Sequence, residues 1–348
     1  MKGRKRQKIK FIILLLLVLL SAMFSLILYA IFAFQPMPKV VSVRQIYTDR
    51  FGQVFWLSQD NQLYISGWNR DRFGFYDTSF RWGKMYGLRF LLGKKEPVLF
   101  TEHVSDVFKC EDGVLYTDLD GKLYYYGEQT GGKTEAIAEN VKTASHSSFG
   151  VAYISSDSSA HFMIWDYGAS TWAEPIILME NAQDINVDEE CLRLLTKDGQ
   201  IWQWDLLGNK NPTKQDAAII ADNVEAMWTG RDITVIQKVD GVYQVLSREN
   251  NNTPREIKNL NANSKNLDEI ILDMDLKDPY PGSYYLTAQG NIYILEGEAS
   301  TLVASLPENN IVDFSVNYEE LYIMSRDGTY QSIPCQSGQS GDGSLIDR

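Results

Sequence analysis

The sequence predicts an all-β protein: a seven-bladed β-propeller of four-stranded antiparallel blades, preceded by one N-terminal transmembrane helix. Three observations lead to this fold class. A long apolar run lies near the N-terminus, a stretch of alternating apolar residues returns along the chain, and two landmarks in each copy keep a fixed spacing. Small antiparallel sheets that repeat every 40 to 50 residues or so are typical of propeller blades.

The N-terminal segment has the composition of a membrane anchor. Six basic residues lie within residues 1–10, and an uncharged apolar run extends from Phe11 to Phe34. A helix crosses the hydrocarbon core of a bilayer with roughly 20 residues. The alternative is a cleavable secretory signal, whose apolar core is only about 7 to 15 residues long and ends at a small-residue cleavage site, which Ile31–Ala33 resembles poorly. We therefore predict an uncleaved transmembrane signal anchor at residues 11–34.

This anchor sets the predicted topology. Basic flanks stay on the cytoplasmic side of a membrane, so residues 1–10 are predicted to be cytoplasmic. The protein is then a single-pass protein of the cell membrane, with its propeller domain, residues 36–334, outside the cytoplasm. Residues 335–348 are polar and rich in Gly and Ser, which predicts a disordered tail.

The charge of the chain excludes one class of partner. Beyond residue 10 it carries 27 Lys and Arg against 45 Asp and Glu, a net charge of −18. An acidic domain repels nucleic acid, so no nucleic-acid partner is expected. The three cysteines form no CxxC pair, and the three histidines are scattered, so the sequence predicts no disulfide framework, no metal site and no cofactor. These residues are Cys110, Cys191, Cys335, His103, His146 and His161.

A tight turn between two alternating apolar stretches occurs seven times. Gly accepts a positive φ and Asp tolerates it, so an Asp-Gly pair lets the next strand return antiparallel. The turns lie at Asp60-Asn61, Asp120-Gly121, Asp157-Ser158, Asp198-Gly199, Asp240-Gly241, Gln289-Gly290 and Asp327-Gly328. Seven turns predict seven blades.

A second landmark, an Asn or His followed by a small apolar residue, precedes five of these turns by 17 residues. The pairs lie at positions 103 and 120, 140 and 157, 181 and 198, 223 and 240, and 310 and 327. A further β-like stretch precedes most of these landmarks, which gives about four strands for each repeat. The last repeat lacks its fourth strand, and we expect residues 39–43 (KVVSV) to supply it by pairing with the sheet around Tyr330.

The repeats resemble the regulator of chromosome condensation family. The resemblance rests on "VSDVF" followed by "DGKLYYYG", on "VKTASHSSFGVAYISSDSSAHFMIWDYG", and on "ISGWNRDRFGF" at residues 65–75. It covers most of residues 39–334 and implies a β-propeller. Nuclear members of that family engage chromatin and a small GTPase, but an acidic domain outside the membrane gives no basis for transferring those roles.

One motif points to a different chemistry. Residues 127–134 (GEQTGGKT) match the phosphate-binding pattern G-x-x-x-x-G-K-[ST] through Gly127, Gly132, Lys133 and Thr134. A functional site of this kind needs a helix directly after the loop. The repeat register instead places a strand there, so we interpret the match as coincidental and assign no cofactor to it.

The most irregular segment is an insertion in the first repeat, residues 69–95. It carries seven basic and two acidic residues on an otherwise acidic domain, with aromatic residues between them. Arg, Trp and Tyr are the residue types that dominate protein interfaces. We predict that the insertion binds a partner, or alternatively that its aromatic residues pack onto the side of the propeller. The candidate contact residues are Arg72, Phe73, Phe75, Tyr76, Trp82 and Tyr86.

These features predict a membrane-anchored, extracytoplasmic module that binds or scaffolds another envelope protein through its propeller loops. The alternative is an exported enzyme or glycan-binding propeller that uses acidic and aromatic groups in the central channel. No nucleophile or zinc-protease motif is present, so the chain is not predicted to be an enzyme and no catalytic residues are assigned. A sensor that signals inward is disfavoured because only about ten residues precede the predicted span.

Overall fold

The computed structural model describes two compact units. Its described residues are 20–21, 24–25, 42–48, 53–67, 98–188, 190–207, 212–230, 233–247, 252–257, 271–277, 282–296, 299–305, 311–316 and 320–334. The larger unit spans residues 39–76 and 97–348, and the smaller unit spans residues 1–38 and 77–96.

The structure describes little of the smaller unit. Its described residues are Leu20, Ser21, Phe24 and Ser25, which are helical. Across all described residues, no helix has the length and apolar character needed to cross a membrane. Most of the predicted anchor, the whole of the insertion at 69–95 and the predicted tail at 335–348 lie outside the described residues.

The described part of the larger unit is built almost entirely from strands, with one short 3-10 helix, η1 (Lys214–Asp216). The strands of the first half are β1 (Val43–Thr48), β2 (Gln53–Ser58), β3 (Leu63–Gly67), β4 (Val98–Thr101), β5 (Val104–Cys110), β6 (Gly113–Asp118), β7 (Leu123–Gly127), β8 (Glu135–Ala138), β9 (Val141–Ser147), β10 (Gly150–Ser155), β11 (Ala160–Asp166), β12 (Thr171–Trp172) and β13 (Ile176–Met179). Those of the second half are β14 (Ala182–Val187), β15 (Cys191–Thr196), β16 (Ile201–Asp205), β17 (Ala218–Ala221), β18 (Val224–Thr229), β19 (Ile233–Lys238), β20 (Tyr243–Ser247), β21 (Arg255–Glu256), β22 (Ile271–Lys277), β23 (Gly282–Thr287), β24 (Asn291–Glu296), β25 (Ala299–Ser305), β26 (Ile311–Val316), β27 (Glu320–Ser325) and β28 (Tyr330–Pro334).

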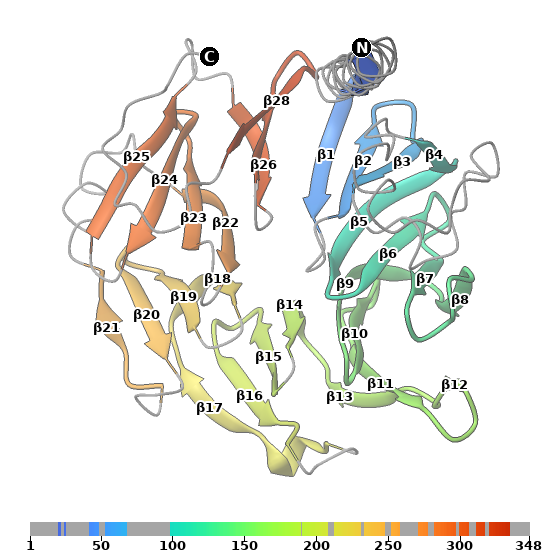
Figure 1. Ribbon diagram of the computed structural model, residues 1–348. Helices are drawn as coiled ribbons and strands as arrows, with labels where there is room; N and C mark the ends of the chain where they lie inside the picture. Colours follow the sequence, from blue (N-terminus) through green and yellow to red (C-terminus); the bar gives the residue numbers. More distant parts are fainter. Residues whose placement is uncertain are drawn as a thin grey trace, which may run out of the picture. The chain divides into compact units, whose positions relative to one another are not determined.

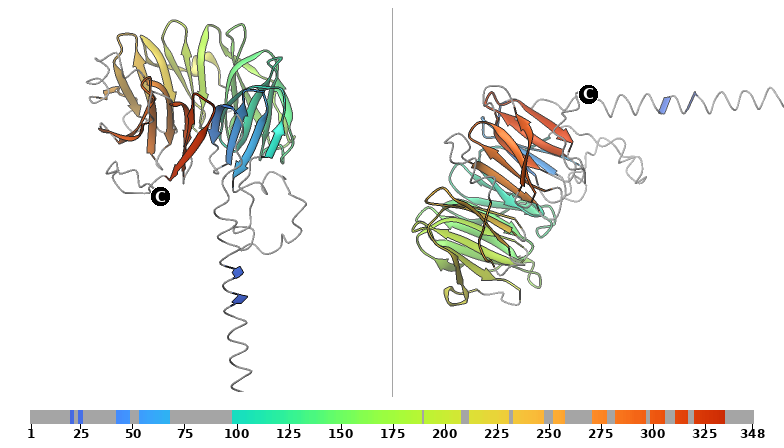
Figure 2. Two further views of the ribbon diagram at one scale, coloured as in Figure 1. Left: turned by 90° about the horizontal axis from the view of Figure 1, so that it is seen from above. Right: turned by 90° about the vertical axis from the view of Figure 1, so that its left-hand side faces the viewer.

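Within the described residues these strands form six hydrogen-bonded sheets arranged in a ring, with the first strand of each repeat toward the centre (Figure 1). Four sheets are four-stranded meanders: β1–β4, β14–β17, β18–β21 and β22–β25. The sheet of β5–β13 has nine strands, because a parallel pairing of β5 with β9 joins two meanders, and the sheet of β26–β28 has three strands. Seen from the side, the strands run roughly along the axis of the ring (Figure 2).

Each central strand carries a β-bulge at the same position. The pairing with the second strand of the repeat shifts by one residue directly after the first residue of β1, β5, β9, β14, β18, β22 and β26. A bulge inserts one unpaired residue and increases the local twist. Every central strand is therefore bent in the same way at its beginning.

The fixed spacing of 17 residues has a structural cause. His103, Asn140, Asn181 and Asn223 all have positive φ, and each directly precedes a central strand. The next residue donates its N–H to the carbonyl of the turn in the preceding repeat, as in Val141 to Gly121 at 2.8 Å. The same bond joins Val104 to Asn61, Ala182 to Ser158, and Val224 to Gly199. The landmark and the turn are thus the two ends of a contact that links one repeat to the next.

The ring closes differently from our expectation. Val43 does not pair with the sheet around Tyr330; it begins β1 and faces Ser58 of β2. Its N–H donates to the carbonyl of Gly328 at 3.2 Å, which is the same link that joins the other repeats. Ser42, with a φ of 58°, occupies the position that Asn holds elsewhere. The prediction for this segment was therefore wrong where the structure describes it, and residues 39–41 lie outside the described part.

The hydrophobic core is divided among the junctions between neighbouring sheets. One buried cluster joins β1–β4 to β5–β8, and a second joins β5–β8 to β9–β11. At the closing junction the ring of Trp56, which is fully buried, lies 4.2 Å from the ring of Tyr330 and 5.5 Å from that of Tyr322. These contacts bury apolar area between the first and last sheets and thereby hold the ring closed.

Candidate functional site

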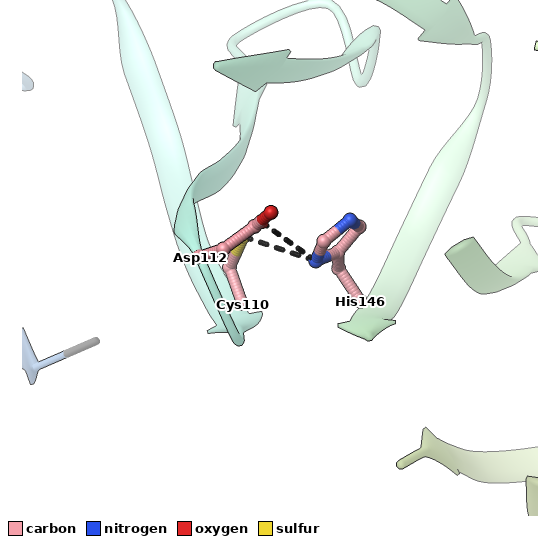
Figure 3. Close-up of side chains that lie close together, drawn as sticks. All are labelled: Cys110, Asp112 and His146. Atoms are coloured by element: carbon pink, nitrogen blue, oxygen red, sulfur yellow. Dashed lines mark hydrogen bonds and ion pairs between the residues drawn. The ribbon is translucent and has the colours of Figure 1, made fainter. Parts of the chain in front are cut away.

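The described residues contain one group of metal-ligating side chains that lie together: Cys110, Asp112 and His146. Cys110 ends β5, His146 lies in β9, and Asp112 is in the turn between β5 and β6. Cys110 and His146 face each other in the parallel pairing that joins the two meanders. Figure 3 shows their side chains converging from these two strands.

Two contacts meet at one nitrogen of the imidazole. The Nδ1 atom of His146 is 3.5 Å from the Sγ atom of Cys110 and 3.4 Å from the Oδ1 atom of Asp112. The second ring nitrogen, Nε2, lies 3.2 Å from the Oε1 atom of Gln129. If that nitrogen carries the proton, the lone pair of Nδ1 points toward both the thiol and the carboxyl group.

Surrounding residues fix the orientation of this group. The ring of Tyr125 stacks on the ring of His146 at 4.6 Å, and its hydroxyl donates to Oδ1 of Asp112 at 2.9 Å. Trp172 lies edge-on to both rings. The backbone N–H of Cys110 donates to the hydroxyl oxygen of Tyr47 at 2.7 Å. Both strands of the junction are therefore held by groups from neighbouring strands.

Burial determines the charge states here. Removal from water lowers the pKa of His146 below its usual range, and the nearby carboxyl of Asp112 offsets this only in part. Burial likewise raises the pKa of Tyr125, and Asp112 adds to that rise. His146 is therefore neutral at physiological pH, and Tyr125 keeps its proton and serves as a donor.

The group has two conceivable chemistries. A thiol beside an imidazole whose other nitrogen bonds an amide oxygen is an arrangement for nucleophilic catalysis. Cys110, however, has no solvent-exposed surface, so a substrate carbonyl cannot reach its sulfur in this structure. The second chemistry is metal binding, for which thiolate, imidazole and carboxylate are the usual ligands.

This group was not predicted from the sequence, because its members are far apart in the chain and match no motif. Cys110 and His146 each lie near the end of the central strand of consecutive repeats. An alignment of repeats, rather than a search for short motifs, would have placed them side by side.

The phosphate-binding match does not adopt the geometry of that motif. Gly127 ends β7, and Gly131 and Gly132 have positive φ. Strand β8 follows Thr134, so no helix N-terminus faces the loop. Within the loop, Thr130 donates its hydroxyl to the carbonyl of Lys133 at 2.6 Å.

The predicted contact residues of the insertion lie outside the described residues. They are Arg72, Phe73, Phe75, Tyr76, Trp82 and Tyr86. The structure does describe where the insertion is attached: it leaves the ring at Gly67, the end of β3, and returns at Val98, the start of β4.

Comparisons with known proteins bear on the fold. No protein-family profile matches the chain, and no curated protein matches it. Among solved structures, human WBSCR16 is 11% identical over 83% of this chain and 89% of that chain, with a TM-score of 0.61. Yeast RCC1 (Prp20), solved with Kap60 bound, is 10% identical over 70% of this chain and 74% of that chain, with a TM-score of 0.53.

A bacterial protein resembles this chain in structure to a similar degree. PorZ, a surface component of the type-IX secretion system of Porphyromonas gingivalis, is 12% identical over 87% of this chain and 38% of that chain, with a TM-score of 0.52. Identities this low establish the fold alone. The prediction of a β-propeller built from antiparallel strands is confirmed for the described residues 42–334.

Proposed function

We propose that the protein is a membrane-anchored, extracytoplasmic scaffold that binds a protein partner through its propeller loops, chiefly through the insertion at residues 69–95. The observation that carries this proposal is the length of the connection between β3 and β4. It takes residues 68–97, whereas equivalent connections range from residues 297–298 between β24 and β25 to residues 206–217 between β16 and β17. Adjacent antiparallel strands need only a few residues to connect, so a segment this long serves something other than the fold.

The composition of the insertion indicates the kind of partner. Its seven basic residues stand against two acidic ones on a chain with a net charge of −12. Complementary charge speeds association and sets orientation, while buried aromatic side chains supply most of the affinity. The partner surface is therefore expected to be acidic at its rim, with apolar pockets that receive Phe73, Tyr76 or Trp82.

The propeller neighbours support a binding role. Yeast RCC1 was solved with Kap60 bound, and PorZ is described as a bacterial surface component. A propeller offers a rigid ring that positions loops for a partner, although the fold alone does not specify which partner. The anchor at residues 11–34 would hold this ring at the outer side of the cell membrane, beside other envelope proteins.

We also propose that the ring has seven blades. The nine-stranded sheet contains two meanders, β5–β8 and β9–β13, which are joined only at Lys109–Ser145 and Cys110–His146. If each meander counts as one blade, the described sheets make seven, and the last blade has the three strands β26–β28.

The rival proposal, an enzyme or glycan binder in the channel, would need several carboxyl groups with perturbed pKa values on one channel face. Burial raises the pKa of Asp184, on the central strand β14, to about 6. One carboxyl group of this kind does not make a catalytic pair, and the long insertion at residues 69–95 favours the binding role.

The test is partner capture by cross-linking in native membranes. Full-length protein is compared with a variant in which residues 70–95 are replaced by a short Gly/Ser loop. A second variant carries alanine at the six predicted contact residues, and Tyr167→Ala is the matched control, since Tyr167 is an aromatic side chain 71% exposed on a different connection. We expect one envelope protein to be captured by the full-length chain and by the control, and to be lost from the other two.

Two results would contradict the proposal. Equal capture by the loop replacement would show that the insertion is not the binding surface. Capture of no protein by the full-length chain would remove the scaffolding role and favour a small ligand or glycan in the channel.

A further inference from the structure

We propose that Cys110, Asp112 and His146 bind a zinc ion at the junction of β5 and β9, with water as the fourth ligand. This site is independent of the partner-binding role proposed above. It would link two neighbouring repeats at the one place where their central strands pair directly, through only two residue pairs.

The two distances from His146 to the other ligands fit tetrahedral zinc. Zinc bonds of about 2.0 to 2.3 Å place tetrahedral ligand atoms about 3.3 to 3.5 Å from one another. The Nδ1 atom of His146 lies 3.5 Å from Sγ of Cys110 and 3.4 Å from Oδ1 of Asp112, and the three ligand atoms all lie within 4.8 Å of one another. A direct N–H···O bond is normally about 2.7 to 3.2 Å long, so the His146–Asp112 separation is longer than such a bond and agrees better with a shared ion.

The residues that hydrogen-bond to this group are of the kind that orient the ligands of a metal site. Histidines that bind metal usually donate their other N–H to an oxygen, which fixes the tautomer and the ring orientation. Gln129 provides that oxygen to Nε2 of His146 at 3.2 Å. The Tyr125 hydroxyl donates to Asp112, as expected for a ligating carboxylate, and its ring stacks on the imidazole. The lone pair of Nδ1 is then directed at the position between the three ligand atoms.

Charge gives a second reason for a cation. Asp112 is buried, and within the described part of the chain it forms no ion pair with a lysine or arginine. A buried carboxylate without a partner cation is costly. A divalent ion there would compensate both the carboxylate and the thiolate.

The ligand set selects the type of metal. Calcium and magnesium take oxygen ligands, whereas copper(I) prefers several sulfur ligands. One sulfur, one nitrogen and one oxygen suit zinc. On binding, the Cys110 thiol loses its proton as the sulfur–zinc bond forms, so each ion that enters releases one proton to solvent when Asp112 is already ionised.

The experiment uses tag-free full-length protein, purified in detergent, stripped with a chelator and reloaded with Zn²⁺ alone. Elemental analysis after removal of free metal should give one zinc per chain. Reloading with Co²⁺ in place of zinc should give a thiolate-to-cobalt charge-transfer band and the intense d–d bands of a tetrahedral site.

Four variants locate the ion. Cys110→Ser should abolish the charge-transfer band, and His146→Gln should abolish stoichiometric zinc. Gln129→Ala removes the oxygen that orients the imidazole, and we expect it to weaken zinc binding about 10- to 100-fold. Cys191→Ser is the matched control, because Cys191 is the other buried free thiol among the described residues, and zinc content should not change.

The proposal fails on the wild-type chain alone if folded protein shows no thiolate-to-cobalt band, so it does not depend on whether the variants fold. It also fails if Cys110→Ser retains the band, or if Cys191→Ser loses it. Loss of partner capture in the loop-replacement variant leaves zinc content unchanged, so the two proposals stand or fall separately.

Discussion

Two buried cysteines of this ring have different surroundings. Cys110 lies beside Asp112 and His146, whereas Cys191 lies beside Asp188 and Arg193. The Sγ atom of Cys191 is 3.3 Å from Oδ2 of Asp188, and the guanidinium of Arg193 is 3.1 Å from the same oxygen. Both groups thus combine a thiol and a carboxyl group with a nitrogen base, and they differ in whether that base is permanently charged.

The difference determines what each group can do. Arg193 keeps its positive charge and compensates Asp188 without any other cation. Burial raises the pKa of the Cys191 thiol well above its usual range despite Arg193, so this sulfur stays protonated. The group around Cys110 has a neutral imidazole in place of the guanidinium. Asp188 near Cys191 is already neutralised by its ion pair with Arg193. Asp112 near Cys110 has a metal ion in that role instead.

The largest effect should follow from removing the fixed charge. Arg193→Met leaves Asp188 buried without its cation, and breaking a buried pair from one side costs about 3 to 5 kcal/mol. Denaturant unfolding of the full-length chain would measure this loss. Asp188→Asn combined with Arg193→Met should recover part of it, because the double variant buries no charge. A loss below about 1 kcal/mol would show that Asp188 is compensated in another way.

A third carboxyl group, that of the half-buried Asp184, sharpens the comparison. Burial raises the pKa of Asp184 to about 6, and the positive charge of Lys109 offsets this rise only weakly. The raised value means that the folded chain holds this proton up to about pH 6, whereas the unfolded chain releases it near pH 4. Between those values the free energy of unfolding should fall as the pH rises, by up to about 3 kcal/mol, and it should stay low above pH 6.

Asp184→Asn removes this dependence. The amide keeps an oxygen that can accept the N–H of Ile185, which Asp184 accepts at 2.8 Å in the structure. At pH 7.5 the variant should therefore be more stable than the wild type, by at most about 3 kcal/mol, and the advantage should vanish near pH 4. Unfolding curves at a series of pH values measure it, and a variant that is less stable at pH 7.5 would contradict the assignment.

The next effect tests the support of the metal-binding group. A Cβ atom at Gly127 would lie 2.1 Å from the Tyr125 hydroxyl, which bonds Asp112. Gly127→Ala should displace that ring, cost about 1 to 3 kcal/mol and lower zinc affinity. Gly168→Ala is the control, because its Cβ would meet only the carboxylate oxygen of Asp166 at 3.2 Å. Equal zinc affinity in both variants would show that the position of Tyr125 does not affect zinc binding.

Sequence reasoning recovered the repeated elements well, because local rules govern them. Positive φ at Gly121, Gly199 and Gly328 and the alternating strands follow from turn chemistry and side-chain periodicity. The closing link was missed, because Ser42 lies one residue farther from its turn than the other landmarks and is not Asn. Its position depends on Gly328, at the far end of the chain.

The candidate site could not be predicted from spacing. Cys110 and His146 meet through the contact between repeats, and their separation along the chain matches no metal motif. The insertion at 69–95 shows the opposite case. Its composition is evident from sequence, but its contacts depend on surfaces that the sequence does not specify.

The smallest effect concerns the charge state of His146. Its lowered pKa means that the unfolded chain takes up a proton near pH 6.5 while the folded chain does not, so the free energy of unfolding should fall as the pH drops below 6.5. The slope from one proton cannot exceed about 1.4 kcal/mol per pH unit. The titratable groups that face the ring are Cys110, Asp112 and Tyr125, and of these Asp112 opposes the shift.

Asp184 changes stability in the opposite direction over an overlapping pH range, so the measurement belongs in the Asp184→Asn background. There, metal-free protein should lose stability on acidification from pH 7 to pH 5, and His146→Gln should flatten the curve. Zinc-loaded protein should lose more over the same interval, because protonation must also displace the ion. If acidification affects the metal-free and zinc-loaded forms equally, the imidazole of His146 is a core side chain like any other, and Cys110 and Cys191 differ only in the charge beside them.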